Sequence, residues 1–193
     1  GYMDVIALFQ HGITQAVATL GTATTPEHAE LLFRNAPDVY FCFDGDAAGR
    51  RAASKAMESV LPRMKDGRQA FFLFLPDGED PDTLVRHEGS AGFDLRLRDA
   101  TPLSTFFFDE LRKDANLGTL DGKARMAERA KPLLAQIPDG AFGDLMRQRL
   151  TELTGVGARA ATQAQPSSQR ARAQAAPTQK RSLVRSAIAL LLQ

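Results

Sequence analysis

The sequence predicts an α/β domain with a mostly parallel sheet, followed by a small helical subdomain, a disordered linker and a C-terminal helix. Up to residue 75, short and continuously apolar runs alternate with helical stretches. Such runs are typical of parallel strands that helices bury on both faces. Apolar residues then recur at helical spacing with no strand between them. A stretch with few large apolar side chains separates these helices from a last apolar segment.

The alternating part is expected to hold three helices and three strands. Start and stop signals mark the helices, such as Asp4 as a cap, Gly12 as a terminator and Pro26 at a first helical position. The strands are uniformly apolar or rich in β-formers. The expected helices cover 4–11, 26–35 and 47–64. The expected strands cover 16–20, 39–43 and 70–75.

Three apolar stripes follow residue 83 and predict three packed amphipathic helices. The stripes begin at Leu103, Met126 and Phe142, and Pro132 is expected to bend the middle helix. We expect four parts in all: a metal-binding α/β domain over 1–95, a helical subdomain over 96–156, a flexible basic linker over 157–180, and the start of a further domain over 181–193. Within that last part, the apolar run 182–193 is predicted to be a helix.

Composition and charge limit the classes of function. The chain has 193 residues, 44% of them hydrophobic and 24% charged, as in an ordinary globular protein. No apolar run approaches the roughly 20 residues that a membrane-spanning helix needs. The single cysteine, Cys42, excludes an internal disulfide or a cysteine zinc site and is expected to be buried. Six basic residues and no acidic ones lie between 157 and 185, a charge pattern that favours a solubilising spacer and also suits loose contact with nucleic acid.

Two pairs of aspartates carry the chemistry. Asp44 and Asp46 follow one predicted strand, and Asp80 and Asp82 follow the next. The carboxyl ends of parallel strands share one edge of the sheet, which is where α/β proteins bind ligands. Four carboxylates brought together there need a counter-charge. The spacing therefore predicts a site for magnesium, a hard cation that prefers oxygen ligands.

The motifs around these aspartates resemble a known family. Asp44-Gly45-Asp46-Ala47-Ala48-Gly49-Arg50 and Gly78-Glu79-Asp80-Pro81-Asp82-Thr83-Leu84 are similar to the TOPRIM domain of bacterial DnaG-type primases. The opening Gly1-Tyr2-Met3-Asp4-Val5-Ile6 is similar to the rest of the family's Glu-Gly-Tyr-Met-Asp-Val motif, and Ala18-Thr19-Leu20-Gly21 also matches. The resemblance covers about residues 1–155.

The resemblance implies a TOPRIM-like fold and a nucleotidyltransferase that makes short RNA primers on single-stranded DNA. It implies that Asp44 and Asp46 are catalytic, and that Asp80, Asp82 and the neighbouring Asp4 join them around Mg²⁺ or Mn²⁺. Apart from the resemblance, Arg50 follows the first acid pair on a predicted helix, where it either meets phosphates near the metals or belongs to the solvated face of that helix. The implied partners are the DNA template, nucleoside triphosphates, the RNA primer and a DnaB-type replicative helicase, bound through a C-terminal domain that begins near 181. A cytoplasmic, bacterial monomer without membrane contact is expected.

The chain also departs from the family pattern. The family's catalytic glutamate would precede Gly1, and its zinc-binding domain and its basic template-gripping subdomain would lie further upstream. Zinc is therefore not expected here. The resemblance implies that this chain alone binds metal imperfectly and makes no primers.

Three alternatives stay open at this stage. Another TOPRIM enzyme, a topoisomerase or a nuclease, is one, although a topoisomerase needs a nucleophilic tyrosine and only Tyr2 and Tyr40 are present. A haloacid-dehalogenase-type phosphatase also uses an Asp-x-Asp after a strand, but Ala47 and Ala48 stand where that family has threonine or valine. A non-catalytic helicase-interaction module is the third.

Overall fold

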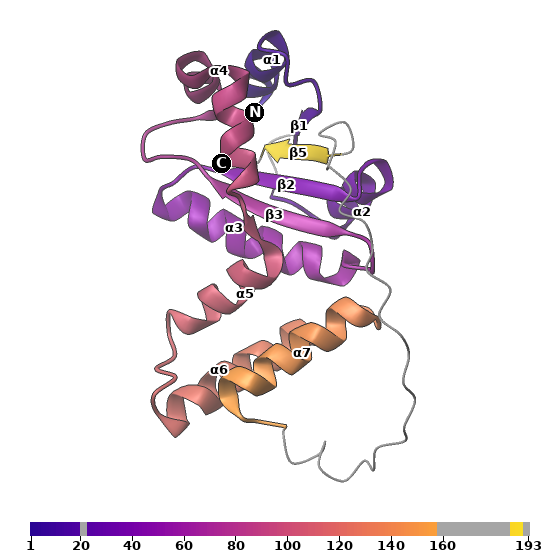
Figure 1. The fold of residues 1–193 in the computed structure, drawn as a ribbon, viewed down its shortest axis with the longest axis vertical. Helices are drawn as coiled ribbons and strands as arrows, with labels where there is room; N and C mark the ends of the chain where they lie inside the picture. Colours follow the sequence, from indigo (N-terminus) through magenta and orange to yellow (C-terminus); the bar gives the residue numbers. More distant parts are fainter. Residues whose placement is uncertain (20–22, 158–185, 191–193) are drawn as a thin grey trace, which may run out of the picture.

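The structure is a computed structural model that describes residues 1–19 and 23–157, together with the backbone of 186–190 (Figure 1). Its sheet has the strand order β1-β5-β2-β3-β4. β1, β5, β2 and β3 run parallel to their neighbours, and the short β4 pairs antiparallel with β3. The strands cover Ala16–Ala18 (β1), Asp38–Phe43 (β2), Gln69–Phe74 (β3), Thr101–Pro102 (β4) and Ser186–Leu190 (β5). The mostly parallel sheet of the prediction is confirmed.

Helices cover both faces of this sheet (Figure 1). α1 and α4 pack on one face, and α2, α3 and α5 pack on the other. α6 and α7 lie beyond α5 and form the helical part of the molecule with it. The helices cover Tyr2–Gln10 (α1), Pro26–Asn35 (α2), Ala47–Val60 (α3), Pro81–Arg98 (α4), Leu103–Arg112 (α5), Leu120–Leu134 (α6) and Ala141–Thr154 (α7), with a 3₁₀ turn at Leu61–Arg63.

Alternation along β2 and β3 divides the core into two clusters. Phe41 and Phe72 point to the α3 face, whereas Tyr40 and Phe71 point to the α4 face. The register pairs Tyr40 with Phe71 and Phe41 with Phe72, so like-facing rings stack across the two strands. Period-two alternation thus gives one pair of strands two apolar faces. Cys42 is buried on the α4 face as expected, and burial raises the pKa of its thiol.

α4 is the element that the pattern of apolar residues did not reveal. Its apolar positions are few, and Gly89 interrupts the helix with a φ of 67°. Its start is nevertheless well marked, because Asp80 caps it and Pro81 occupies the first helical position. The helix also runs across residue 95, where we expected the α/β part to end.

The last strand corrects one prediction. Residues 182–193 were expected to form a helix, but Ser186–Leu190 is β5, which inserts between β1 and β2. Alanine and leucine favour a helix locally. A strand in this central position has its backbone hydrogen-bonding groups paired on both sides, which overrides the weak local preference. The linker predicted at 157–180 lies outside the described residues beyond Gly157.

A loop of the α/β part caps the last helix. Asp66 lies between the 3₁₀ turn and β3, and its carboxylate accepts hydrogen bonds from the backbone N–H groups of Ala141 and Phe142, both at 3.1 Å. These groups belong to the first turn of α7, where backbone donors have no partner within the helix. Asp66 thereby ties the helical part to the sheet.

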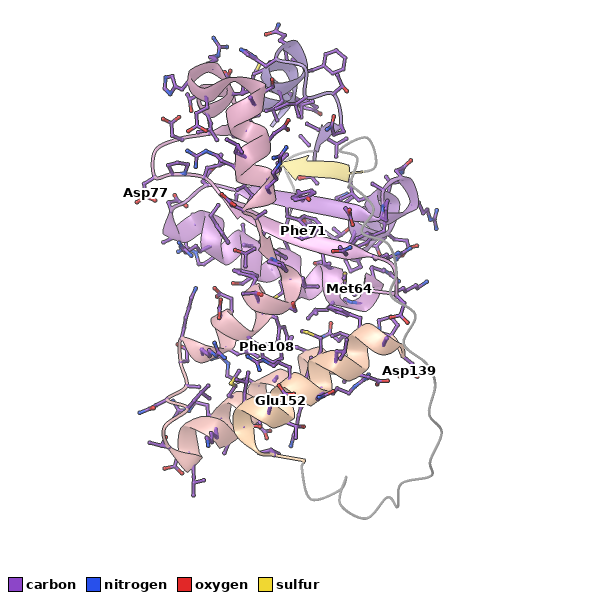
Figure 2. The ribbon with its side chains drawn as sticks, viewed as in Figure 1. Met64, Phe71, Asp77, Phe108, Asp139 and Glu152 are labelled. Atoms are coloured by element: carbon purple, nitrogen blue, oxygen red, sulfur yellow. The ribbon has the colours of Figure 1, made fainter. Side chains whose placement is uncertain are left out.

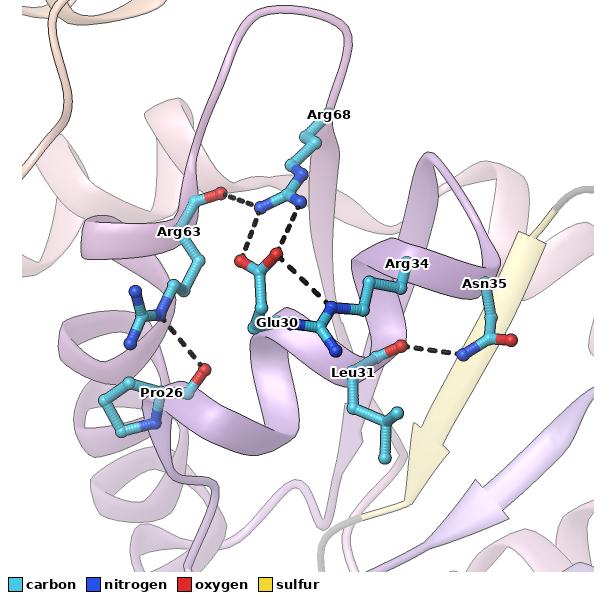
Figure 3. A network of polar contacts seen from close by, with 7 residues as sticks. All are labelled: Pro26, Glu30, Leu31, Arg34, Asn35, Arg63 and Arg68. Atoms are coloured by element: carbon cyan, nitrogen blue, oxygen red, sulfur yellow. Dashed lines mark hydrogen bonds and ion pairs between the residues drawn. The ribbon is translucent and has the colours of Figure 1, made fainter.

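A second polar network fixes α2 against the start of β3 (Figure 3). Arg68 donates two hydrogen bonds to the carboxylate of Glu30, at 2.9 and 3.0 Å, and a third to the carbonyl of Arg63. The same guanidinium lies 5.1 Å from the ring centroid of Phe33. Its hydrogen bonds lower the pKa of Glu30 from 4.5 to about 2.

We expect Glu30→Gln to destabilise the protein at pH 7 but not at pH 2. The Glu30 pKa is lower in the folded chain than in the unfolded one, so ionised Glu30 contributes stability above about pH 4.5. That contribution is lost as the pH falls towards 2. Thermal unfolding of both proteins between pH 2 and 7 measures it. A melting-temperature difference that is constant across this range would contradict the assignment.

Candidate metal-binding active site

The two acidic loops leave the sheet side by side. β2 and β3 are parallel neighbours, and their last residues, Phe43 and Phe74, are directly paired. The loop with Asp44 and Asp46 therefore starts at the same edge as the loop that ends in Asp80. Figure 2 shows Asp77 on this second loop, at the opposite end of β3 from Met64. The structure brings these loops together as the spacing predicted.

Each loop ends in an aspartate that caps the following helix. Asp46 accepts a hydrogen bond of 2.7 Å from the N–H of Gly49 in α3. Asp80 accepts one of the same length from the N–H of Thr83 in α4, and the Thr83 hydroxyl accepts one from the Asp80 N–H. Each capping bond uses one carboxylate oxygen. The positive ends of α3 and α4 thus help to hold negative charge at this edge.

Gly45 allows the two loops to touch. A Cβ at this position would lie 2.2 Å from the carbonyl oxygen of Leu75 and 2.8 Å from the carboxylate of Asp77. The φ of Gly45 is not in the left-handed region, so close approach, and not turn formation, requires glycine here.

Gly49 has an equally strict role one turn into α3. A Cβ there would lie 2.2 Å from the carbonyl oxygen of Asp44, so the helix rests directly on the Asp44 backbone.

We expect Gly49→Ala to destabilise the protein by roughly 1–3 kcal/mol, the usual cost of forcing a group into packed space. Helix propensity alone predicts the opposite, a gain of about 1 kcal/mol. The sign of the change therefore reports the contact with Asp44. Urea unfolding with a two-state fit measures it, and stability equal to or above the wild type would contradict the contact.

Asp44 lies in a field of like charge. It is half-buried, and this burial raises the pKa of its carboxyl. Neighbouring carboxylates raise the pKa further, in the order Asp46, Asp4 and Asp80. Asp4 is buried in α1 and pairs with the Gly1 amino group. Four of the five predicted metal ligands therefore share one electrostatic environment.

Asp82 differs from the other four. It is bonded to the guanidinium of Arg86, one helical turn further along α4, and is not among the charges that shift the pKa of Asp44. The Asp-x-x-x-Arg spacing is a common helical ion pair and was a signal for this arrangement.

Arg50 stands at the same edge of the sheet. Its guanidinium lies 5.0 Å from the ring centroid of Phe74, the last residue of β3. A cation held over an aromatic face is attracted by the ring. Arg50 is exposed, so its donors face solvent beside the acidic loops.

The acidic residues suit a divalent cation in their chemistry. In residues 1–19 and 23–157, no three carboxylate, imidazole or thiol groups converge closely enough to hold one metal ion. Magnesium does not need three, because it keeps several waters and commonly binds one or two carboxylates. Burial and the three neighbouring carboxylates raise the pKa of Asp44, so its ionised form is short of positive charge nearby. A divalent ion with its water shell would supply that compensation.

Two family models match this chain, one in its α/β part and one in its helical part. The family model of Toprim-like domains matches residues 1–85, and the model of the DnaB-helicase binding domain of primase matches residues 104–158. A DNA primase of Pseudomonas aeruginosa is 57% identical over 157 residues, and that of Escherichia coli K12 is 53% identical over 156. The chain belongs to the bacterial DnaG-type primases. The topoisomerase, nuclease and phosphatase alternatives are thereby set aside.

Solved structures agree with this primase assignment. A primase domain from Pseudomonas aeruginosa matches 82% of this chain with a TM-score of 0.80 and 56% identity. A DnaG catalytic core matches 81% with a TM-score of 0.78 and 52% identity, which confirms the TOPRIM-like fold. The chain spans 24% and 27% of the length of the curated primases, and half of each solved catalytic core. No helix in the part of this primase chain that the structure describes is long and apolar enough to cross a membrane.

Proposed function

We propose that this chain carries the metal-binding half of a primase active site, which joins ribonucleotides into short primers on single-stranded DNA in the bacterial cytoplasm. The observation that supports this proposal most is the grouping of four carboxylates, those of Asp44, Asp46, Asp80 and Asp4, near the shared edge of β2 and β3. A cluster that repels itself in the absence of a cation is suited to binding one.

Each residue has a proposed role in that chemistry. Asp44 and Asp46 hold the cation, Asp80 and Asp4 strengthen the field around it, and Asp82 joins them if Arg86 releases it. Mg²⁺ or Mn²⁺ held by these residues would supply positive charge to the triphosphate, whose α-phosphate is attacked by a 3′ oxygen with pyrophosphate as the leaving group. Arg50 offers a further cation for the phosphates. Gly45 and Gly49 are positioning residues that fix the two loops.

The partners are proposed on the same basis. A DnaG primase catalytic domain solved bound to single-stranded DNA matches 79% of this chain with a TM-score of 0.75 and 53% identity. We propose that single-stranded DNA, nucleoside triphosphates and the RNA primer meet this chain at the acidic edge of the sheet, and that it acts as a monomer. We expected helicase docking to begin near residue 181, but the helicase-binding family match lies at 104–158. We therefore propose the helical part as the helicase contact.

One surface suggests that the catalytic core extends beyond this chain. α1 exposes four large apolar side chains to solvent: Tyr2, Met3, Ile6 and Phe9. Its opposite side packs Ala7 and Leu8 into the core. A helix that is apolar all round is normally buried. We propose that another part of the primase core covers this face.

A chimera tests the proposed function. Residues 1–157 replace the matched segment of the Pseudomonas aeruginosa primase, and primer synthesis is measured on single-stranded DNA with Mg²⁺ and nucleoside triphosphates. We expect the chimera to make primers at a rate within tenfold of the parent, and the present chain alone to make none. A folded chimera without activity, or primer synthesis by the chain alone, would contradict the proposal.

A further inference from the structure

The helical part contains a groove between α5 and α7. Its volume is about 400 Å³ and it is open to solvent on one side. Phe108 of α5 and Met146 of α7 lie at its floor, since both are almost completely buried. Phe108 faces the space between the helices (Figure 2). Leu145, 63% exposed, forms part of the wall.

The groove exists because the two helices use other faces for packing. α5 turns Phe106 towards the sheet, where its ring stacks on Phe72 at 4.5 Å between centroids. α7 packs mainly on α6. The facing sides of α5 and α7 meet at the buried Phe108 and Met146, and a groove stays open above these two side chains beside the exposed Leu145.

Two arginines flank this apolar surface. Arg112 of α5 and Arg149 of α7 both line the groove, and each side chain is about half exposed. Their contacts within the chain are surface ion pairs, at 3.6 Å to Asp109 and at 3.0 Å to Glu152. Exposed pairs of this kind contribute little and exchange easily. An incoming carboxylate could therefore replace either partner.

We propose that this groove is the site at which the helicase docks, through a segment that places an apolar side chain on Phe108 and Met146 and a carboxylate beside Arg112 or Arg149. This inference rests on the proposed function, which makes the helicase a partner. The helicase-binding family match starts at Ser104, a residue of the groove wall, and includes every lining residue. An apolar anchor with a charged rim is the usual form of a small protein-binding hot spot.

A matched pair of leucine substitutions tests the apolar part. Leu145→Asp puts a charge into the groove wall, whereas Leu120→Asp puts the same charge on α6 outside the groove. Leu120 is 84% exposed and Leu145 is 63% exposed, so both proteins should fold. In a solution binding assay with the full-length chain and a DnaB-type helicase, we expect Leu145→Asp to raise the dissociation constant at least tenfold. Leu120→Asp should change it less than twofold.

A pair of charge reversals tests the rim. Arg149→Glu should weaken helicase binding at least fivefold at low salt and reduce its salt dependence, because an ion pair with the partner is lost. Arg125→Glu makes the same change on an exposed position of α6 outside the groove and should leave both quantities unchanged. Equal effects of the two reversals would overturn the docking mode.

The remaining outcomes separate this inference from the proposed function. If the wild-type chain binds helicase and Leu145→Asp binds it equally well, the groove is not the docking site, but the helicase is still a partner. If the wild-type chain does not bind helicase, both the helicase contact and its location in the groove are wrong. Primer synthesis by the chimera does not depend on this result. A photo-crosslinker in place of Leu145 should capture a helicase segment that contains an acidic residue. Capture of the chain's own residues or of a second copy would overturn the proposal.

Discussion

Asp44→Asn is expected to abolish primer synthesis by the chimera and, at the same time, to raise the melting temperature of the metal-free chain. Burial raises the pKa of the Asp44 carboxyl, and the three carboxylates of Asp46, Asp4 and Asp80 raise it further. Loss of a metal ligand removes several kcal/mol of transition-state stabilisation, so we expect activity to fall at least about a hundredfold. Loss of the same charge removes repulsion from the folded state.

The stability effect has a defined dependence on pH. The pKa of Asp44 is higher in the folded chain than in the unfolded one, so ionised Asp44 destabilises the fold at neutral pH. This penalty disappears as the pH falls and both states become protonated. The gain from Asp44→Asn should therefore be present at pH 7 and absent near pH 3. Thermal unfolding without metal, repeated with added Mg²⁺, measures both the gain and its loss when the cation is bound.

Asp82→Asn is the control for this experiment. Asp82 has an ion pair with Arg86 and does not shift the pKa of Asp44. Its substitution should not stabilise the metal-free chain, although it too stands in the acidic motif. If both variants raised the melting temperature equally, the gain would reflect the overall charge, and its assignment to repulsion at Asp44 would be wrong.

The sequence predicted the elements whose signal is local. Strands such as Asp38–Phe43 and Gln69–Phe74 are apolar on both faces, and α5, α6 and α7 each have a single apolar stripe, so their type and order followed from periodicity. α4 was missed because Gly89 interrupts it and its apolar positions are sparse. β5 was mistaken for a helix because its conformation depends on β1 and β2, which lie far away in the sequence.

The candidate site shows the same limit. The spacing of the aspartates placed Asp44, Asp46 and Asp80 at one edge of the sheet, because parallel strands end together. The resemblance, and not the spacing, brought in Asp4. Neither could show that Gly45 packs against the Leu75 carbonyl, or that Asp82 prefers Arg86 to the cluster. Those features depend on distances of a few ångströms between separate loops.

Phe72→Ala is the substitution that we expect to cost the fold most. Phe72 is 1% exposed and is the point where the sheet meets the helical part. Its ring stacks on Phe41 and Phe43 within the sheet, at 5.7 and 6.0 Å, and on Phe106 of α5 at 4.5 Å. Removal of a buried phenylalanine ring leaves a cavity and typically costs about 3–5 kcal/mol. Since three aromatic neighbours lose their partner at once, we expect the upper part of this range.

Urea unfolding followed by two signals measures this prediction. Circular dichroism reports the helices. The change in tyrosine fluorescence reports Tyr40 in the sheet, because the other tyrosine, Tyr2, is already 64% exposed in the folded chain. Because Phe72 joins the two regions, both transitions should shift to lower urea together. Phe9→Ala removes the same ring from a position that is 61% exposed and should cost less than about 1 kcal/mol, as surface substitutions usually do. A loss for Phe72→Ala no larger than that for Phe9→Ala would show that α5 is held to the sheet by contacts other than this aromatic stack.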